Sequence, residues 1–192
     1  MRNLTMAQKE NQRIALTKKL LQEGLLRLLE TKPLDGISVT ELCKESGINR
    51  ATFYNHYSSP HDLLTDIGNR LTAQLKLIIE HVKTAEDASK QLVHICEFFQ
   101  AHAPTIIALN RCHADTQITD ALYDLNLSYQ THLVNNSKYA KQATPEGLHL
   151  IAVFFYTGSY NILLEWIRKD LPLTPTEVAT MMLLLAKEDA LG

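Results

Sequence analysis

Residues 38–64 read SVTELCKESGINRATFYNHYSSPHDLL, and this stretch decides the fold of the first third of the chain. It opens with a capping box, SVTE, in which the Ser38 hydroxyl is placed to accept a hydrogen bond from the amide three residues on. The side chain of Glu41 reaches back to the start of the same helix. The pattern predicts a short helix over residues 39–46.

A second short helix follows after a tight turn. Gly47 stands where a left-handed backbone is expected after a helix, and Asn49 is placed to cap a helix over residues 50–56. Two short helices joined by a glycine-containing turn form a helix-turn-helix, in which the second helix crosses the first steeply.

The crossing requires a small residue in the first helix and apolar anchors in the second. Cys43 supplies the small residue, and Ile48 and Phe53 supply the anchors. With Phe53 turned inward, a helix this short cannot bury the polar residues around it, so it presents them outward.

The outward residue types suit DNA. A helix fits the major groove, where arginine reads guanine, asparagine reads adenine, and threonine or alanine contacts the thymine methyl group. Tyrosine hydroxyls, histidine and the free amides at a helix start suit phosphate oxygens.

The remaining sequence predicts an all-α protein of about nine helices, with a domain boundary near residues 57–60. Glycine and proline are scarce, at 7 and 6 residues, which favours long helices over tight turns. Apolar residues recur at helical spacing over residues 11–31. Capping residues followed by proline predict helix starts at Pro60, Pro145 and Pro175. The helix that begins at Pro60 is expected to run to about Val82. Breaks between helices are expected near Pro104 and near residues 112–115.

The stretch over residues 37–64 resembles the DNA-binding region of the TetR family of bacterial transcription regulators, most specifically in TFYNHY and the following HDLL. Residues 154–185 more faintly resemble the last two helices of one subgroup. The resemblance implies a three-helix DNA-binding domain (residues 1–58) and a helical effector-binding and dimerisation domain (residues 59–192). It also implies a homodimer that binds a palindromic operator, with its two recognition helices about 34–36 Å apart. Such a protein would act as a repressor and be released or modulated by a small-molecule effector.

Family practice, carried over by position, also assigns DNA contacts. It implies backbone contacts from Thr40, Thr52, Tyr54 and His56, and base contacts from Arg50, Ala51 and Asn55. Asn49, at the helix start, completes the predicted DNA-binding set.

Two departures from the family pattern keep an alternative open. Many members carry a lysine where this chain has Pro60, and often an arginine where it has Thr40. Each change removes about one charge from phosphate binding. Residues 1–70 hold ten Lys/Arg against eight Asp/Glu, so the head is only mildly basic. The alternative is a TetR-like protein that has lost DNA binding and acts as a protein-interaction co-regulator.

Two sites are predicted in the C-terminal part. The helix over residues 145–169 is apolar on nearly every side and must be covered, which predicts a four-helix dimer interface. The interface residues are Phe154, Gly158, Asn161, Ile162, Val178, Met181, Met182 and Leu185. Aromatic residues mixed with polar ones suit a small-molecule pocket. The predicted effector contacts are Phe98, Phe99, Arg111, Tyr123, Phe155 and Tyr156.

Other functional classes find little support. No HExxH, P-loop, GxGxxG or GxSxG motif occurs, so we expect neither an enzyme nor a cofactor or metal. An α-helical enzyme stays open as a third hypothesis, which would require a bound cofactor.

The cysteines and the first residues of the sequence bear on localisation. Three widely spaced cysteines, a polar start and no signal core predict a cytoplasmic protein with reduced thiols. Residues 147–164 carry no charge, but their polar residues favour a buried helix over a membrane span.

Overall fold

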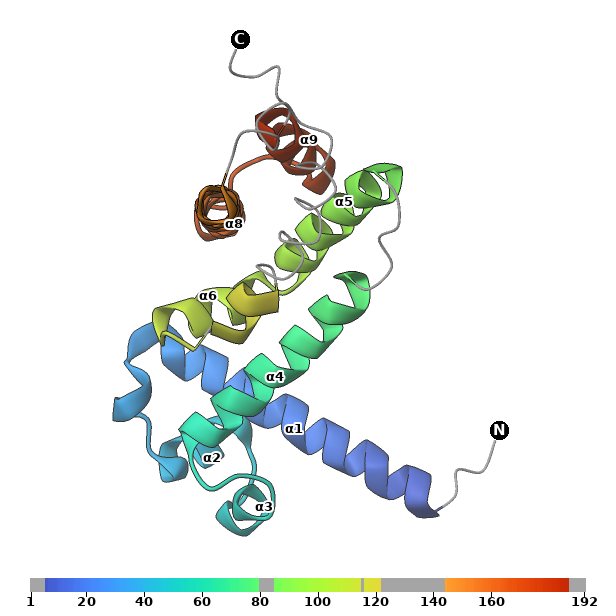
Figure 1. The fold of residues 1–192 in the computed structure, drawn as a ribbon. Helices are drawn as coiled ribbons and strands as arrows, with labels where there is room; N and C mark the ends of the chain where they lie inside the picture. The colour runs from blue at the N-terminus through green and yellow to red at the C-terminus, as the bar shows by residue number, and fades with distance from the viewer. Residues whose placement is uncertain (1–5, 80–84, 115, 122–143, 187–192) are drawn as a thin grey trace. The chain divides into compact units, whose positions relative to one another are not determined.

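The computed structural model of the chain is built of helices (Figure 1), and no strand occurs among the residues it describes. The described residues are all except 1–5, 80–84, 115, 122–143 and 187–192. The predicted all-α class is confirmed. The helices are α1 (Met6–Thr31), the 3-10 helix η1 (Leu34–Gly36), α2 (Val39–Ser46), α3 (Arg50–Tyr54), α4 (Pro60–Ile79), α5 (Ala85–Ala101), α6 (Ala103–Arg111), α8 (Pro145–Arg168) and α9 (Pro175–Ala186), with a further helical segment at 116–121.

Most predicted helix starts are confirmed, and two helix lengths differ. Helix α1 begins at Met6 rather than near residue 11. The alanine, glutamine, lysine and glutamate at positions 7–10 have high helix propensity, although they show no apolar periodicity. Helix α3 ends at Tyr54, two residues earlier than predicted. The amides of His56 and Tyr57 both donate to the carbonyl of Phe53, at 2.9 Å each, which closes the chain into the turn before α4.

The caps follow the predicted chemistry at the other starts. The Thr144 hydroxyl accepts from the amide of Gly147 at 3.2 Å, with Pro145 in the first turn of α8. The Thr174 hydroxyl accepts from the Glu177 amide at 3.3 Å, while the Glu177 carboxylate accepts from the Thr174 amide at 2.7 Å. The expected break near Pro104 lies at His102, between α5 and α6.

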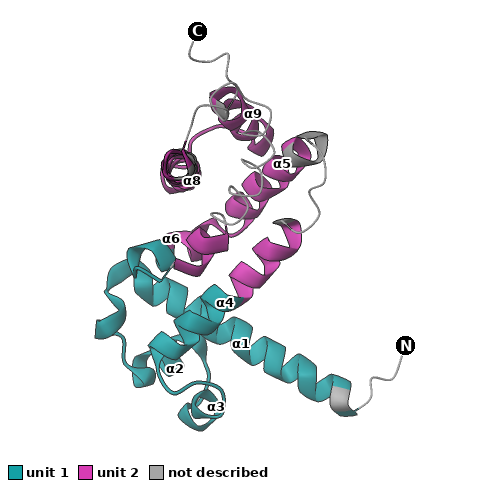
Figure 2. Ribbon diagram, viewed as in Figure 1, with its two compact units in different colours: residues 1–69, 108–114 teal, residues 70–107, 115–192 magenta. Residues whose placement is uncertain are grey.

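The chain forms two compact units (Figure 2). Unit 1 comprises residues 1–69 and 108–114, and unit 2 comprises residues 70–107 and 115–192. Helices α4 and α6 therefore each contribute to both units. The domain boundary predicted near residues 57–60 concerns independent folding and stays a prediction.

Each unit has its own apolar core. In unit 1 the largest fully buried side chains come from α1, α2, α3, α4 and α6, and they are Leu21, Leu25, Leu42, Phe53, Leu63, Leu64, Ile67 and Leu109. In unit 2, α5 packs against α8 and α9. The rings of Phe99 and Tyr160 meet edge to face across α5 and α8, with centroids 6.3 Å apart. The Gln91 side chain donates to the Ile78 carbonyl, which ties α5 to the end of α4.

Within the described chain, no single helix combines the length and the hydropathy needed to cross a membrane. Helices α5 and α6 meet that criterion only as a pair, across a bend of 77°.

Candidate nucleic-acid interface

The turn between α2 and α3 has the geometry that the sequence predicts. The Ser38 hydroxyl accepts from the Glu41 amide at 3.2 Å and caps α2. Gly47 adopts φ 69°, in the left-handed region that favours glycine. The amide of Ile48 donates to the Cys43 carbonyl at 3.0 Å, which closes the end of α2 and reverses the chain.

Helix α3 is fixed at its start and through its inward face. The Asn49 side chain accepts from the Thr52 amide at 2.7 Å, so the amide group is used as a cap. Phe53 is completely buried, and Leu42 and Cys43 of α2 are buried in the same unit. The orientation of the helix about its own axis is therefore set by one aromatic anchor.

The opposite face of α3 is open. Four of its predicted DNA contacts are exposed: Arg50, Ala51, Tyr54 and Asn55. Thr52 and His56 are half-buried at the edges of this face, and Thr40 is exposed on α2. Tyr54 is 52% exposed, and the Arg50 guanidinium carbon lies 6.0 Å from the centre of its ring. Tyr57, by contrast, is buried.

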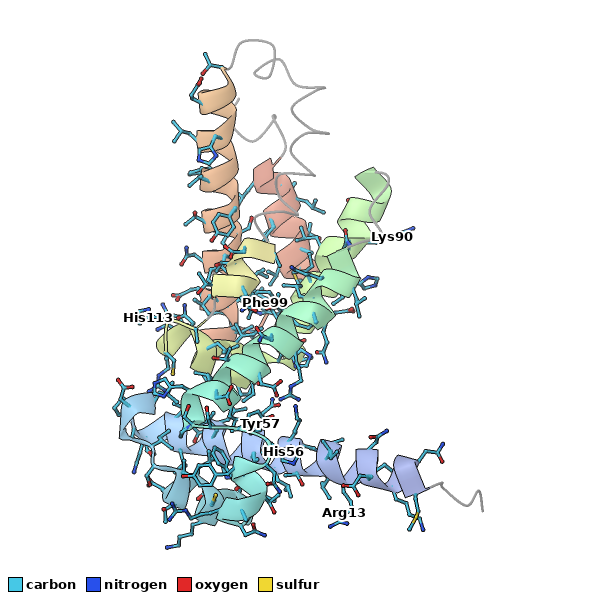
Figure 3. The ribbon with its side chains drawn as sticks, turned by 60° about the horizontal axis from the view of Figure 1, so that its bottom comes forward. Arg13, His56, Tyr57, Lys90, Phe99 and His113 are labelled. Carbon is cyan, nitrogen blue, oxygen red and sulfur yellow. The ribbon has the colours of Figure 1, made fainter. Side chains whose placement is uncertain are left out.

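Asp66 anchors the segment that follows α3, and nothing in the sequence pattern singled it out. Its Oδ2 accepts from the Tyr57 hydroxyl at 2.6 Å and lies 3.4 Å from Lys18 Nζ. Lys18 Nζ also lies 5.4 Å from the centre of the Tyr57 ring. One carboxylate thus joins α1, the α3–α4 turn and α4, and Figure 3 shows Tyr57 between these elements.

Helices α1 and α2 are held together by ion pairs and a close approach. Arg27 Nε lies 2.6 Å from Glu45 Oε1, and Lys32 Nζ lies 2.5 Å from Glu41 Oε1. A Cβ atom on Gly24 would lie 3.0 Å from Ser46 Cβ, so glycine permits the two helices to approach closely here.

No cationic side chain replaces the lysine that many family members carry at the position of Pro60. His61, next to Pro60, places its Nε2 2.9 Å from Asp35 Oδ1 in η1.

The thiol of Cys43 belongs to the core of unit 1. Burial raises its pKa, and the nearby Arg50 charge lowers that pKa by a smaller amount, so Cys43 is a protonated core thiol. In the described part of the chain, no three His, Cys, Asp or Glu side chains are placed to hold a metal ion.

The residues predicted to contact an effector are distributed over both units. Phe98 and Phe99 are buried in unit 2, and Tyr156 on α8 is half-buried there. Arg111 belongs to unit 1 and is exposed. Tyr123 and the side chain of Phe155 lie outside the described residues.

The residues predicted to form a dimer interface lie mostly on an open surface of α8 and α9. Phe154 is 73% exposed, and nothing lies within 4 Å of a Cβ built on Gly158. Asn161, Ile162, Met181 and Leu185 are also exposed, whereas Val178 and Met182 are buried within the subunit. Leu150, Val153, Leu171 and Leu184 extend this exposed apolar surface.

A groove runs along the same surface. It encloses about 510 Å³ and is lined by Asn161, Ile162, Glu165, Trp166, Leu171, Leu173, Val178 and Met181. The Trp166 indole donates to the Leu173 carbonyl at 3.1 Å, which holds the α8–α9 loop beside the groove.

Comparison with known proteins places this arrangement in a family. Residues 86–188, more than half of the chain, match the TetR family model described as "Transcriptional regulator C-terminal region". The chain belongs to the TetR family of transcription regulators. The family that it matches is one of transcription regulators, not of enzymes.

A curated relative supports the same conclusion for a shorter stretch. Over 81 residues the chain is 33% identical to YxbF of Bacillus subtilis (strain 168), an uncharacterized HTH-type transcriptional regulator. The match covers 42% of this chain but only 20% of YxbF, so the chain spans about a fifth of the length of that relative.

Solved structures of bacterial regulators share the fold. A TetR transcriptional regulator from Streptococcus agalactiae 2603V superposes with a TM-score of 0.66 at 19% identity, over 95% of this chain and 99% of that one. The fatty acid degradation regulator FadR from Bacillus halodurans gives a TM-score of 0.60 at 12% identity, over 90% and 95% of the two chains.

Proposed function

We propose that this TetR-family regulator is a cytoplasmic homodimer that binds a palindromic operator and represses transcription from it. A small-molecule effector would release the dimer from the operator. The observation that carries the DNA-binding part is the open face of α3. Phe53 is completely buried while Arg50, Ala51, Tyr54 and Asn55 are exposed on the other side. These side chains match base edges and phosphates in a major groove.

Within this proposal, the side chains of α3 divide the work. Arg50 and Asn55 would read base edges, Ala51 would contact a methyl group, and Tyr54 would bind a phosphate. Thr40, Thr52 and His56 would add backbone contacts from the edges of the face. Asn49 would act indirectly, because its side chain accepts from the Thr52 amide and so fixes the start of α3.

The dimer proposal is supported by the exposed apolar surface of α8 and α9. An exposed apolar patch of this kind marks an interaction site on a soluble protein. Gly158 leaves open space above α8, which would let a partner helix approach closely. We expect Gly158→Glu to yield a monomer in sedimentation equilibrium, because a charged side chain would enter the interface without disturbing the subunit. Leu77→Glu, at an exposed leucine on α4, is the matched control and should leave the dimer intact.

An effector would act by favouring a state in which the two recognition helices are wrongly spaced, and it would weaken operator binding by its difference in affinity between the two states. The buried aromatic residues Phe98 and Phe99 and the half-buried Tyr156 in unit 2 support an apolar or aromatic effector. Screening a compound panel for a rise in melting temperature tests this, and Phe99→Ala should abolish the rise for any true effector.

The second candidate is a TetR-like co-regulator that does not bind DNA. It is supported by Pro60, which carries no charge, and by the pairing of His61 with Asp35, which draws that imidazole towards a carboxylate. Selection of duplexes from a random DNA library with the purified protein separates the two candidates. Our proposal predicts enrichment of a palindrome, and the absence of any retained duplex at low salt would support the co-regulator.

A further inference from the structure

The outer turns of α1 form an exposed arm on unit 1. Over residues 6–16, which we call the α1 arm, every described side chain is exposed except that of the half-buried Ile14. Fully buried side chains begin only at Leu21. At 1.5 Å per residue the arm is about 16 Å long, and Figure 1 shows it projecting past the other elements of this unit.

The charges on the arm differ from the other cations of α1. Lys9 and Arg13 are four residues apart and therefore lie on one helical face, and within the described residues neither pairs with a carboxylate. Gln12 is exposed beside them. The remaining cations of the helix are used internally: Lys18 pairs with Asp66, Lys19 with Glu23, and Arg27 with Glu45.

The arm is anchored where it leaves the packed part of unit 1. Lys18 reaches Asp66, which also accepts from Tyr57, so the base of the arm is tied to the turn after α3. Figure 1 shows α3 and the outer end of α1 on the same lower side of the unit. In Figure 3 the Arg13 side chain points to the side of α1 on which α3 lies.

We propose that the α1 arm is a second DNA contact, in which Lys9 and Arg13 bind the sugar–phosphate backbone beside the segment that α3 would read. This rests on the proposed function. Free cations on an exposed helical face complement phosphates, and they stand in for the charge that Pro60 and Thr40 do not supply. The exposed apolar residues Met6 and Leu16 stand at opposite ends of the arm, which is too little apolar surface for a stable protein interface.

The test compares single charge-removing variants of α1 on duplex DNA. Lys9→Gln and Arg13→Gln each remove one unpaired cation and keep a good helix former. Lys19→Gln is the matched control, because it removes one cation from the same helix that is paired with Glu23 at 3.8 Å. Binding to a random duplex and to the selected operator is measured by fluorescence anisotropy over a series of salt concentrations.

Each arm variant should reduce the slope of log affinity against log salt by about 0.9 for each bound subunit. At 0.15 M salt this corresponds to roughly a fivefold loss of DNA affinity for each contact removed. The loss should be equal on random and operator duplexes, because a backbone contact carries no sequence information. It should disappear on an operator trimmed of its flanking base pairs. Lys19→Gln should change the slope by much less.

Two results would overturn the proposal while leaving the proposed function intact. The first is wild-type DNA binding with unchanged slopes in both arm variants. The second is a drop in oligomeric state of the arm variants in sedimentation equilibrium, which would assign the arm to a second copy of the chain. If the wild-type protein retains no duplex at any salt, both the proposed function and the arm contact are rejected.

Discussion

Tyr57 and Tyr54 lie three residues apart and offer a matched test of how the end of α3 is held. The Tyr57 hydroxyl donates to Asp66 Oδ2 at 2.6 Å from a buried ring, whereas Tyr54 is exposed. Removing one hydroxyl from each, as Tyr57→Phe and Tyr54→Phe, is the same chemical change in two environments. Hydrogen bonds to charged groups contribute about 1.5–3 kcal/mol.

The expected magnitude for Tyr57→Phe is at the low end of that range. The Asp66 side chain retains 27% of its exposure and keeps Lys18 as a partner, so we expect a loss of about 1.5 kcal/mol. For a chain of this length that corresponds to a drop in melting temperature of about 3–6 °C. Tyr54→Phe should change the free energy of unfolding by less than about 0.5 kcal/mol.

Thermal and urea denaturation followed by circular dichroism measure both variants. A double-mutant cycle with Asp66→Asn isolates the pair. In the Asp66→Asn background, the cost of Tyr57→Phe should fall to about 0.5 kcal/mol, because the charged acceptor is gone. Equal losses for Tyr57→Phe and Tyr54→Phe, or a cost for Tyr57→Phe that Asp66→Asn leaves unchanged, would refute the role assigned to Asp66.

Three further predictions concern the turn, the pH dependence of stability and the thiols. Gly47→Ala should cost about 1 kcal/mol of unfolding free energy, because φ is 69° although nothing lies within 4 Å of the new Cβ; Gly36→Ala, at ordinary φ, should be nearly neutral in the same denaturation assay. Burial lowers the pKa of His102 from its ordinary 6.5, so as the pH falls the unfolded state takes up a proton on this residue before the folded state does. The contribution of His102 to the free energy of unfolding should therefore be constant above pH 6.5 and should fall as the pH drops below that value. His102→Gln should flatten that fall in urea titrations at pH 5 to 7, and an unchanged slope would contradict the assignment. Burial raises the pKa of Cys96 to about 12 and leaves its side chain inaccessible, so a thiol reagent at pH 8 should label the half-buried Cys112 first, as peptide mass spectrometry would show; early labelling of Cys96 would contradict the packing of α5.

The helix-turn-helix could be predicted because its signals are local. The Ser38 cap, the glycine at position 47 and the Asn49 cap each act within four residues, and the observed bonds match them. The other half of the predicted capping box is wrong: the Glu41 carboxylate pairs with Lys32 and does not reach back to the start of α2. The inward side of α3 also followed from one buried aromatic residue, Phe53.

Contacts between distant residues could not be predicted in the same way. The close approach of Gly24 to Ser46 and the role of Asp66 both depend on how helices cross, and no spacing in the sequence encodes a crossing angle. Residues 6–10 of α1 lack apolar periodicity, so the sequence predicted the start of this helix about five residues too late. Val178 and Met182 show a third limit, since an apolar stripe does not reveal which side is buried within the subunit.

The central claim is that the open face of α3 reads DNA sequence. The most direct measurement is the ratio of affinities for the selected operator and a random duplex, determined for the wild type, Arg50→Ala and, as a control, Arg168→Ala on α8. We predict that Arg50→Ala lowers this ratio by roughly 5- to 150-fold, which corresponds to about 1–3 kcal/mol of base discrimination, while its melting temperature and oligomeric state stay those of the wild type. An unchanged ratio in folded Arg50→Ala protein, with Tyr54→Ala equally silent, would contradict the claim.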